Sequence, residues 1–127
     1  MIKELVTGTQ HLGLPTADLD QTLSFYQGLG FRVAYQTVND GGRVAFLRLG
    51  DLTIETYESR EAAGRPGAID HVALDVTDVD AAFAALQAGG YRLLDGAVQY
   101  LPFWDRGVRF FTIQGPNGEK IEFSQML

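Results

Sequence analysis

The second half of the chain repeats the first half at a fixed offset of sixty residues. The matching pairs are Leu14 with Leu74, Asp18 with Asp78, Leu19 with Val79, Asp20 with Asp80, Gln27 with Gln87, Gly30 with Gly90, and Phe31 with Tyr91. The only two histidines, His11 and His71, fall at the same offset, and each copy ends near a glutamate, Glu55 or Glu122. Such a repeat indicates one supersecondary unit built twice. The fold must therefore place two histidines and two glutamates at equivalent positions.

The residue pattern of each copy predicts the order strand, helix, strand, strand, strand. In the first copy we expect strands at residues 10–14, 31–38, 43–49 and 52–57, with a helix that Asp18 caps and that ends at Gly28 and Gly30. In the second copy we expect strands at residues 69–75, 91–94, 108–114 and 120–124, with a helix at 79–88 capped by Asp78. Residues 39–42 and 115–118 read as hairpin turns. We thus expect an α+β fold in a single domain over residues 1–127, with module 1 at about 9–58, a linker at about 59–68 and module 2 at about 69–127.

Composition excludes several classes of function. A net charge of −6 provides no basic surplus for nucleic acid. The absence of cysteine excludes disulfides, thiolate nucleophiles and sulfur-ligated metals, so any metal must be held by nitrogen and oxygen. No apolar run has the length of a signal peptide or a membrane span. We expect a cytoplasmic protein that acts on a small molecule, without nucleic-acid or membrane partners.

Strand alternation places the four candidate ligands on polar faces. Glu55 shares a face with Thr53 and Tyr57, whereas Leu52 and Ile54 face the other way. His71 and Glu122 likewise alternate with apolar neighbours. A set of two imidazoles and two carboxylates suits Ni²⁺, Co²⁺, Zn²⁺, Mn²⁺ or Fe²⁺, and the residue types alone do not choose between them.

The chain resembles the vicinal-oxygen-chelate superfamily, which includes glyoxalase I, the bleomycin resistance proteins and extradiol dioxygenases. The segments that carry the resemblance are residues 11–14, 25–31, 70–76 and 115–122. The resemblance implies two tandem βαβββ modules whose eight strands curl into a cup-shaped mixed sheet with the helices outside. It also implies a divalent metal ion held by His11, Glu55, His71 and Glu122, and a homodimer. The site is either within one chain or shared across the dimer.

The resemblance further implies the chemistry. A glyoxalase-I-like lyase or isomerase removes a carbon proton from a substrate with two neighbouring oxygens, and the metal stabilises the enediolate. A carboxylate near the metal serves as the base. Glu122 is the first choice for that role and Glu55 the alternative.

The chain departs from glyoxalase I at two positions. Pro15 stands where that enzyme has an arginine, and Ser59 where it has an asparagine, so glutathione hemithioacetal is expected to be a poor substrate. The alternatives are an isomerase like methylmalonyl-CoA epimerase, which usually has glutamine at the position of Glu55, and a non-catalytic drug- or metabolite-binding protein of the bleomycin-resistance type.

Three further residues are candidates for substrate binding. Phe103 and Trp104 lie in residues 95–107, which the first copy lacks, and they form either a lid over the substrate, an aromatic cover for the core or a dimer contact. Arg109 either binds an anionic group of the substrate or is an ordinary surface arginine.

Overall fold

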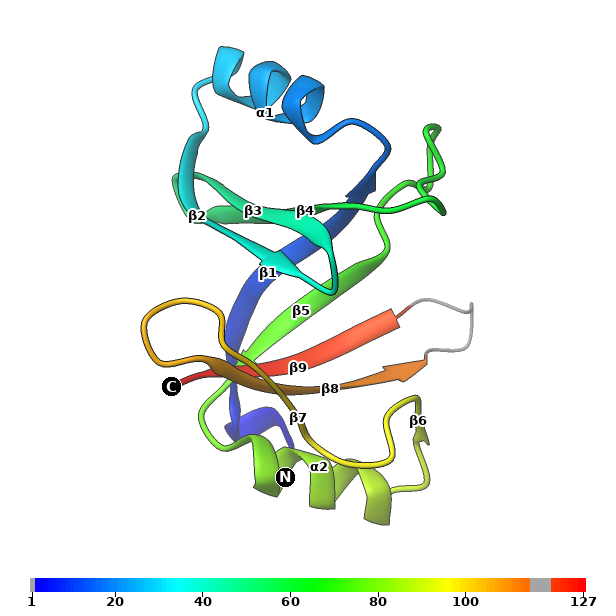
Figure 1. Ribbon diagram of the computed structural model, residues 1–127. Helices are drawn as coiled ribbons and strands as arrows, with labels where there is room; N and C mark the ends of the chain where they lie inside the picture. The colour runs from blue at the N-terminus through cyan, green and yellow to red at the C-terminus, as the bar shows by residue number, and fades with distance from the viewer. Residues whose placement is uncertain (1, 115–119) are drawn as a thin grey trace. The chain divides into compact units, whose positions relative to one another are not determined.

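A computed structural model describes residues 2–114 and 120–127. Its elements are a 3₁₀ turn at Ile2–Glu4, the helices α1 (Leu19–Gly28) and α2 (Val79–Ala88), and the strands β1 (Val6–Thr16), β2 (Arg32–Asn39), β3 (Gly42–Leu49), β4 (Leu52–Glu58), β5 (His71–Val76), β6 (Arg92–Leu93), β7 (Gln99–Leu101), β8 (Val108–Gln114) and β9 (Lys120–Met126) (Figure 1). Hydrogen-bonded neighbours follow the order β2-β3-β4-β1-β5-β9-β8-β6, and β7 pairs with β8. The expected α+β class with two βαβββ repeats is confirmed.

The chain divides into two compact units. One contains residues 11–70, and the other contains residues 1–10 together with 71–127. We call them the first unit and the second unit. The strand β1 contributes its first half to the second unit and its second half to the first unit.

In the first unit, α1 covers the sheet β2-β3-β4-β1. Its core contains Phe31, Leu47 and Ile54, with Leu23 and Tyr26 of α1 packed against them. The turn between β2 and β3 has the positive φ angles of Asp40 (51°) and Gly41 (80°) that a two-residue hairpin requires. β1 pairs in parallel with β4, and β3 pairs antiparallel with β4.

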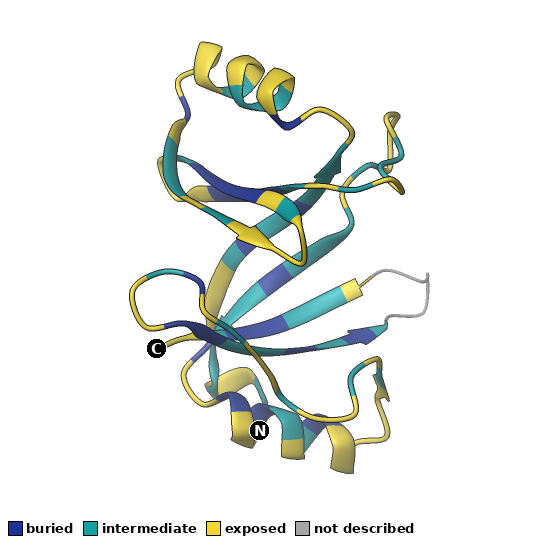
Figure 2. Cartoon of the chain, viewed as in Figure 1, coloured by how far each residue is buried: buried dark blue, intermediate teal, exposed yellow. Residues whose placement is uncertain are grey.

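In the second unit, α2 packs on β8 and β9. Its core contains Val79, Ala82 and Leu86 of α2 and four strand residues, Val76, Phe111, Ile113 and Phe123. Phe111 stacks on Phe123 with ring centroids 5.1 Å apart. Phe111, Ile113 and Phe123 share this core with α2, so the opposite face of β8 and β9 is left for other residues; Figure 2 marks the buried segments of both strands.

Both helices begin as expected. The Asp18 side chain accepts a hydrogen bond from the Gln21 amide, and the Asp78 side chain accepts one from the Ala81 amide. Both helices end two residues before a glycine with positive φ, Gly30 or Gly90. The repeat seen in the sequence therefore extends to the caps.

Three differences from the expected elements stand out. β1 begins at Val6 rather than at residue 10, the 3₁₀ turn was not expected, and the second copy contains an additional strand, β7. The hairpin turn expected at residues 115–118 lies outside the described residues. Of the helices that the structure describes, none combines the length and hydrophobicity needed to cross a membrane.

Candidate metal centre

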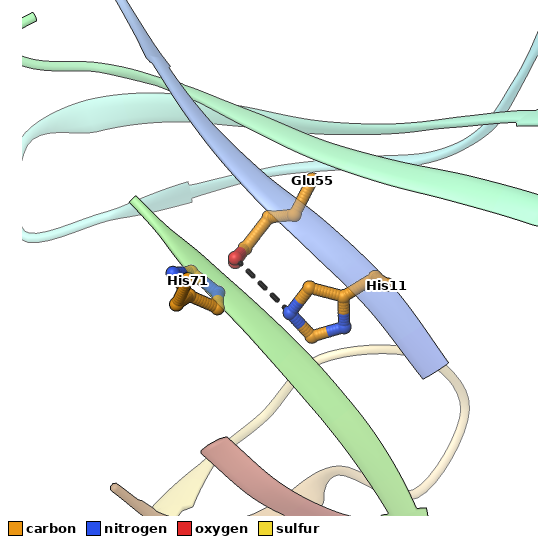
Figure 3. Close-up of side chains that lie close together, drawn as sticks. All are labelled: His11, Glu55 and His71. Atoms are coloured by element: carbon orange, nitrogen blue, oxygen red, sulfur yellow. Dashed lines mark ion pairs between the residues drawn. The ribbon is translucent and has the colours of Figure 1, made fainter. Parts of the chain in front are cut away.

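The first His–Glu pair joins β1 to β4. His11 is 4% exposed, and its Nε2 lies 3.4 Å from Oε1 of Glu55 (Figure 3). The parallel register pairs Glu55 with Gly13, two residues beyond His11. Because side chains two apart on a strand share a face, the imidazole and the carboxylate lie diagonally on one face. The Phe46 ring packs edge-on against the His11 ring, with centroids 5.5 Å apart, and limits the imidazole's freedom to turn.

The second His–Glu pair joins β5 to β9 in the same way. Nε2 of His71 lies 3.7 Å from Oε1 of Glu122, and both side chains are largely buried. The parallel register pairs Glu122 with Ala73, which is again two residues beyond the histidine. Gly13 and Ala73 are both buried and small, so each leaves room for the glutamate beside it. Each unit therefore contains one half-site with the same internal geometry.

The donor types and spacing of each half-site suit a divalent metal ion. Two ligands about 2.1 Å from one ion at a tetrahedral angle lie roughly 3.4 Å apart. The two N···O distances of 3.4 and 3.7 Å are close to this value and longer than an ordinary hydrogen bond of about 2.7–3.2 Å. His11, Glu55 and His71 each offer one nitrogen or oxygen donor of the kind that binds such an ion (Figure 3). Buried carboxylates also need a compensating charge, which a dication supplies.

The three expected substrate-binding residues have different surroundings. The guanidinium of Arg109 makes two hydrogen bonds of 2.8 Å to the carboxylate of Asp80 on α2. Phe103 is buried, and Trp104 is half-buried with a φ of 61°, a backbone conformation that is rare for a bulky side chain. Arg109 is thus paired with α2, and its role in substrate binding, like the roles of Phe103 and Trp104, stays a prediction.

Arg48 was not predicted as a site residue, although it lies near Glu55 in the sheet. The register of the β3–β4 hairpin pairs Phe46 with Glu55 and Arg48 with Thr53, so Arg48 shares the face of Glu55. Its Nε donates a hydrogen bond of 3.0 Å to Oγ1 of the buried Thr53. The sequence could have indicated this shared face, because the two-residue turn at Gly50 and Asp51 fixes the register of the hairpin.

Comparison with known proteins identifies the family. The family model "Glyoxalase/Bleomycin resistance protein/Dioxygenase superfamily" matches residues 8–123. The chain belongs to this superfamily. It is 30% identical over 124 residues to the uncharacterized protein YwbC of Bacillus subtilis (strain 168), with 91% of this chain and 94% of that protein covered.

Two solved structures extend the comparison. A methylmalonyl-CoA epimerase from Mycobacterium tuberculosis is 27% identical, with a TM-score of 0.81 over 97% of this chain and 90% of that chain. A Mn(II)-bound glyoxalase from Novosphingobium aromaticivorans is 21% identical, with a TM-score of 0.67 over 95% of this chain and 39% of that chain. The second likeness concerns the fold alone.

Proposed function

We propose that the two His–Glu half-sites together bind one divalent metal ion and that the protein is a lyase or isomerase of the glyoxalase I type. The observation that supports this most is the equivalence of the half-sites, with N···O distances of 3.4 and 3.7 Å in the same strand register. A single buried His–Glu pair has many structural explanations. Two pairs at repeat-equivalent positions, in a superfamily that includes glyoxalases, favour one shared ion.

The residues of the chain have separate tasks in this proposal. When bound, the metal ion supplies a Lewis acid that stabilises negative charge on a substrate with two neighbouring oxygens. Nε2 of His11 and Nε2 of His71 remain fixed ligands, since Phe46 restrains the first ring and the second is largely buried. The two carboxylates are the groups available to accept a proton from the substrate carbon.

We propose Glu122 as the base, with Glu55 as the alternative. The two carboxylates are buried to nearly the same extent, 14% and 13% exposed, so exposure does not distinguish them. Substitution does. If Glu122 is the base, Glu122→Gln abolishes exchange of the substrate's carbon-bound proton with D₂O, whereas Glu55→Gln reduces it only through weaker metal binding.

Arg48 gives the proposed site a cation for an anionic group of the substrate. It lies on the face of Glu55, and its bond to Thr53 orients the guanidinium. Guanidinium groups bind carboxylates and phosphates through several parallel hydrogen bonds. We therefore expect a substrate that carries an anion in addition to its two neighbouring oxygens.

An isomerase like methylmalonyl-CoA epimerase is the second candidate. It is favoured by the 27% identity and nearly complete mutual coverage with the epimerase from Mycobacterium tuberculosis. Both reactions begin with removal of a carbon proton beside a carbonyl group, so the same residues serve either one. The substrate test must therefore include both classes.

The deciding experiment measures metal first and activity second. Elemental analysis of the purified protein should give about one transition-metal ion per chain, and the four-fold variant of His11, Glu55, His71 and Glu122 to alanine should contain none. The parent protein loaded with Ni²⁺, Co²⁺, Zn²⁺ or Mn²⁺ is then assayed with the methylglyoxal–glutathione hemithioacetal and with methylmalonyl-CoA. Equal metal content in parent and variant would refute the site, and two ions per chain would refute the shared ion.

We also propose a homodimer. The first unit leaves Leu29, Leu49 and Leu52 exposed by 59%, 46% and 37%, which is apolar surface that a partner would cover. Light scattering should report about twice the chain mass of 13.9 kDa. A monomer at micromolar concentration would contradict the proposal and would also exclude a site shared between chains.

A further inference from the structure

A pocket of about 630 Å³ lies within the first unit, lined by residues other than the two His–Glu pairs. Its first wall is one face of α1, with Gln21, Thr22, Phe25 and Tyr26. Its second wall is the linker between the two copies, with Ala62, Gly64, Arg65 and Ala68, and the end of β1 and the start of α1 form the third. This volume is in the range of small-molecule sites, roughly 300–1,000 Å³.

The linker that forms one wall is fastened at both ends to the same strand. The amide of Ser59 donates to the carbonyl of Thr16 at 3.0 Å, and the amide of Asp70 donates to the carbonyl of Gly13 at 2.7 Å. Ser59 also caps its own turn through a bond from the Glu61 amide. A loop fixed at both ends beside a helix gives a pocket with preformed walls, which lowers the cost of ordering the site on binding.

The apolar part of the pocket is aromatic. Phe25 is 61% exposed, and its ring packs edge-to-face on Tyr26 with centroids 5.2 Å apart. Tyr26 is in turn held by Phe31, 5.2 Å away, and so by the core. The exposed ring is thus supported from behind and offers its remaining surface to the pocket.

The polar part of the pocket favours an anion. The carboxylate of Asp18 already caps α1, and the hydroxyls of Thr16 and Thr22 are paired at 2.8 Å. Arg65 differs, because within residues 2–114 and 120–127 its guanidinium makes one hydrogen bond, a long one of 3.4 Å to the carbonyl of Ala63, which leaves most of its five donors for a ligand. The pocket lining thus carries one cation, Arg65, besides the Asp18 carboxylate that is already bonded to the start of α1.

We propose that this pocket binds a flat aromatic anion, with the ring against Phe25 and Tyr26 and the anionic group on Arg65. Stacking on the aromatic wall and a charge-assisted hydrogen bond to the guanidinium would act together. The site does not depend on the proposed metal ion, since its lining contains none of the four His and Glu residues.

The test uses naphthalene-2-sulfonate as the probe, because a sulfonate is a poor ligand for a transition metal. Calorimetry and ligand-observed NMR should show saturable binding to the intact protein, unchanged after metal removal with EDTA. Arg65→Gln and Phe25→Ala should each weaken binding by roughly tenfold. The matched controls, Arg60→Gln in the same linker and Gln27→Ala on the same helix, should bind as the parent does, since neither residue lines the pocket.

Four results would overturn the proposal. These are the absence of saturable binding up to millimolar probe, equal weakening by Arg65→Gln and Arg60→Gln, equal binding of the neutral naphthalene-2-sulfonamide, and loss of binding after EDTA treatment. The first would show that the pocket does not bind this class of ligand. The second would reduce the effect to general charge attraction, and the third would show that the guanidinium recognises no anion. Circular dichroism of each variant controls for folding. Loss of probe binding only after EDTA treatment would assign the probe to the metal site instead.

Discussion

The guanidinium of Arg109 lies 2.8 Å from the carboxylate of Asp80, and the first unit repeats this relationship between Arg43 and Asp20 at 3.1 Å. Each arginine is the second residue of its strand, β8 or β3, and each aspartate is the second residue of its helix. The pairs therefore fasten the start of each helix to its own sheet. Arg109 thus has a structural role, since it forms one of two equivalent arginine–aspartate pairs.

The first prediction concerns the pH dependence of stability. The hydrogen bond from Arg109 lowers the pKa of Asp80, and the hydrogen bond from Arg43 lowers the pKa of Asp20. A carboxyl group whose pKa is lower in the folded state stabilises the protein above its ordinary value of 3.8, and this contribution disappears as the pH falls. Asp80→Asn should therefore lower Tm slightly at pH 7, by about 2 °C or less because the pair is exposed, and the difference should shrink as the pH falls below 3.8.

Thermal melts of parent and Asp80→Asn between pH 3 and pH 7 check this prediction, and 1 M NaCl should shrink the difference. A Tm difference that grows as the pH falls would show that the sign of the effect is wrong. Asp105→Asn provides the matched control, because Asp105 is exposed.

The second prediction concerns a buried hydroxyl. Oγ1 of Thr56 is buried and has no hydrogen-bond partner in the part of the chain that the structure describes. An unpaired buried polar group costs about 1–3 kcal/mol, so Thr56→Val should raise the free energy of unfolding by about 1 kcal/mol. Urea titration measures the change.

Thr53→Val in the same strand is the control with the opposite expected sign. Its hydroxyl accepts a bond from Arg48 and is buried, so its loss should destabilise the protein by about 1 kcal/mol or more. Destabilisation by Thr56→Val would mean that this hydroxyl has a partner, such as an ordered water.

The third prediction concerns the small residue beside each glutamate. Ala73 is fully buried and pairs with Glu122 in the β5–β9 register. The two extra methyl groups in Ala73→Val should push the carboxylate aside, weakening metal binding by about tenfold or more at a stability cost of about 1–3 kcal/mol. Calorimetric titration with Zn²⁺ gives the affinity, and Ala45→Val, also fully buried, controls for crowding of the core. Unchanged affinity in Ala73→Val would remove the steric argument for the half-site.

The fourth prediction concerns Arg48. If it holds an anionic group of the substrate, Arg48→Met should raise KM by about tenfold or more while metal content stays at the parent level. Arg32→Met is the matched control, because Arg32 pairs with Arg48 across β2 and β3 but is exposed. An equal rise in KM for both variants, or a loss of metal from Arg48→Met, would contradict the assigned role.

The helices, their caps and the four His and Glu positions were predictable because they repeat. The short strand β7 was not, since Gln99–Leu101 is too short for an alternating pattern and pairs only with β8. The pairing of Arg109 with Asp80 on α2 could also have been predicted. It shares a face with Phe111, and Phe111 packs under α2, so the alternation that exposed the ligands also placed Arg109 on the helix side. The N···O distances within each half-site depend on the side-chain rotamers of the histidine and the glutamate, and a periodic sequence pattern does not determine rotamers.

The strand β1 has a consequence for dissection of the protein. Thr7 and Gln10 bind the carboxylate of Asp75, and the amide of Thr77 donates to the carbonyl of Leu5. A cut in the linker would thus separate residues 1–10 from the second unit, to which they belong. The C-terminal fragment would lack its edge strand, the first half of β1, and the N-terminal fragment would carry that segment as an unpaired arm. Cleaved halves should recombine by strand complementation. A circular permutant that starts at Gly67 and joins residue 127 to residue 1 would keep this arm attached to its own unit.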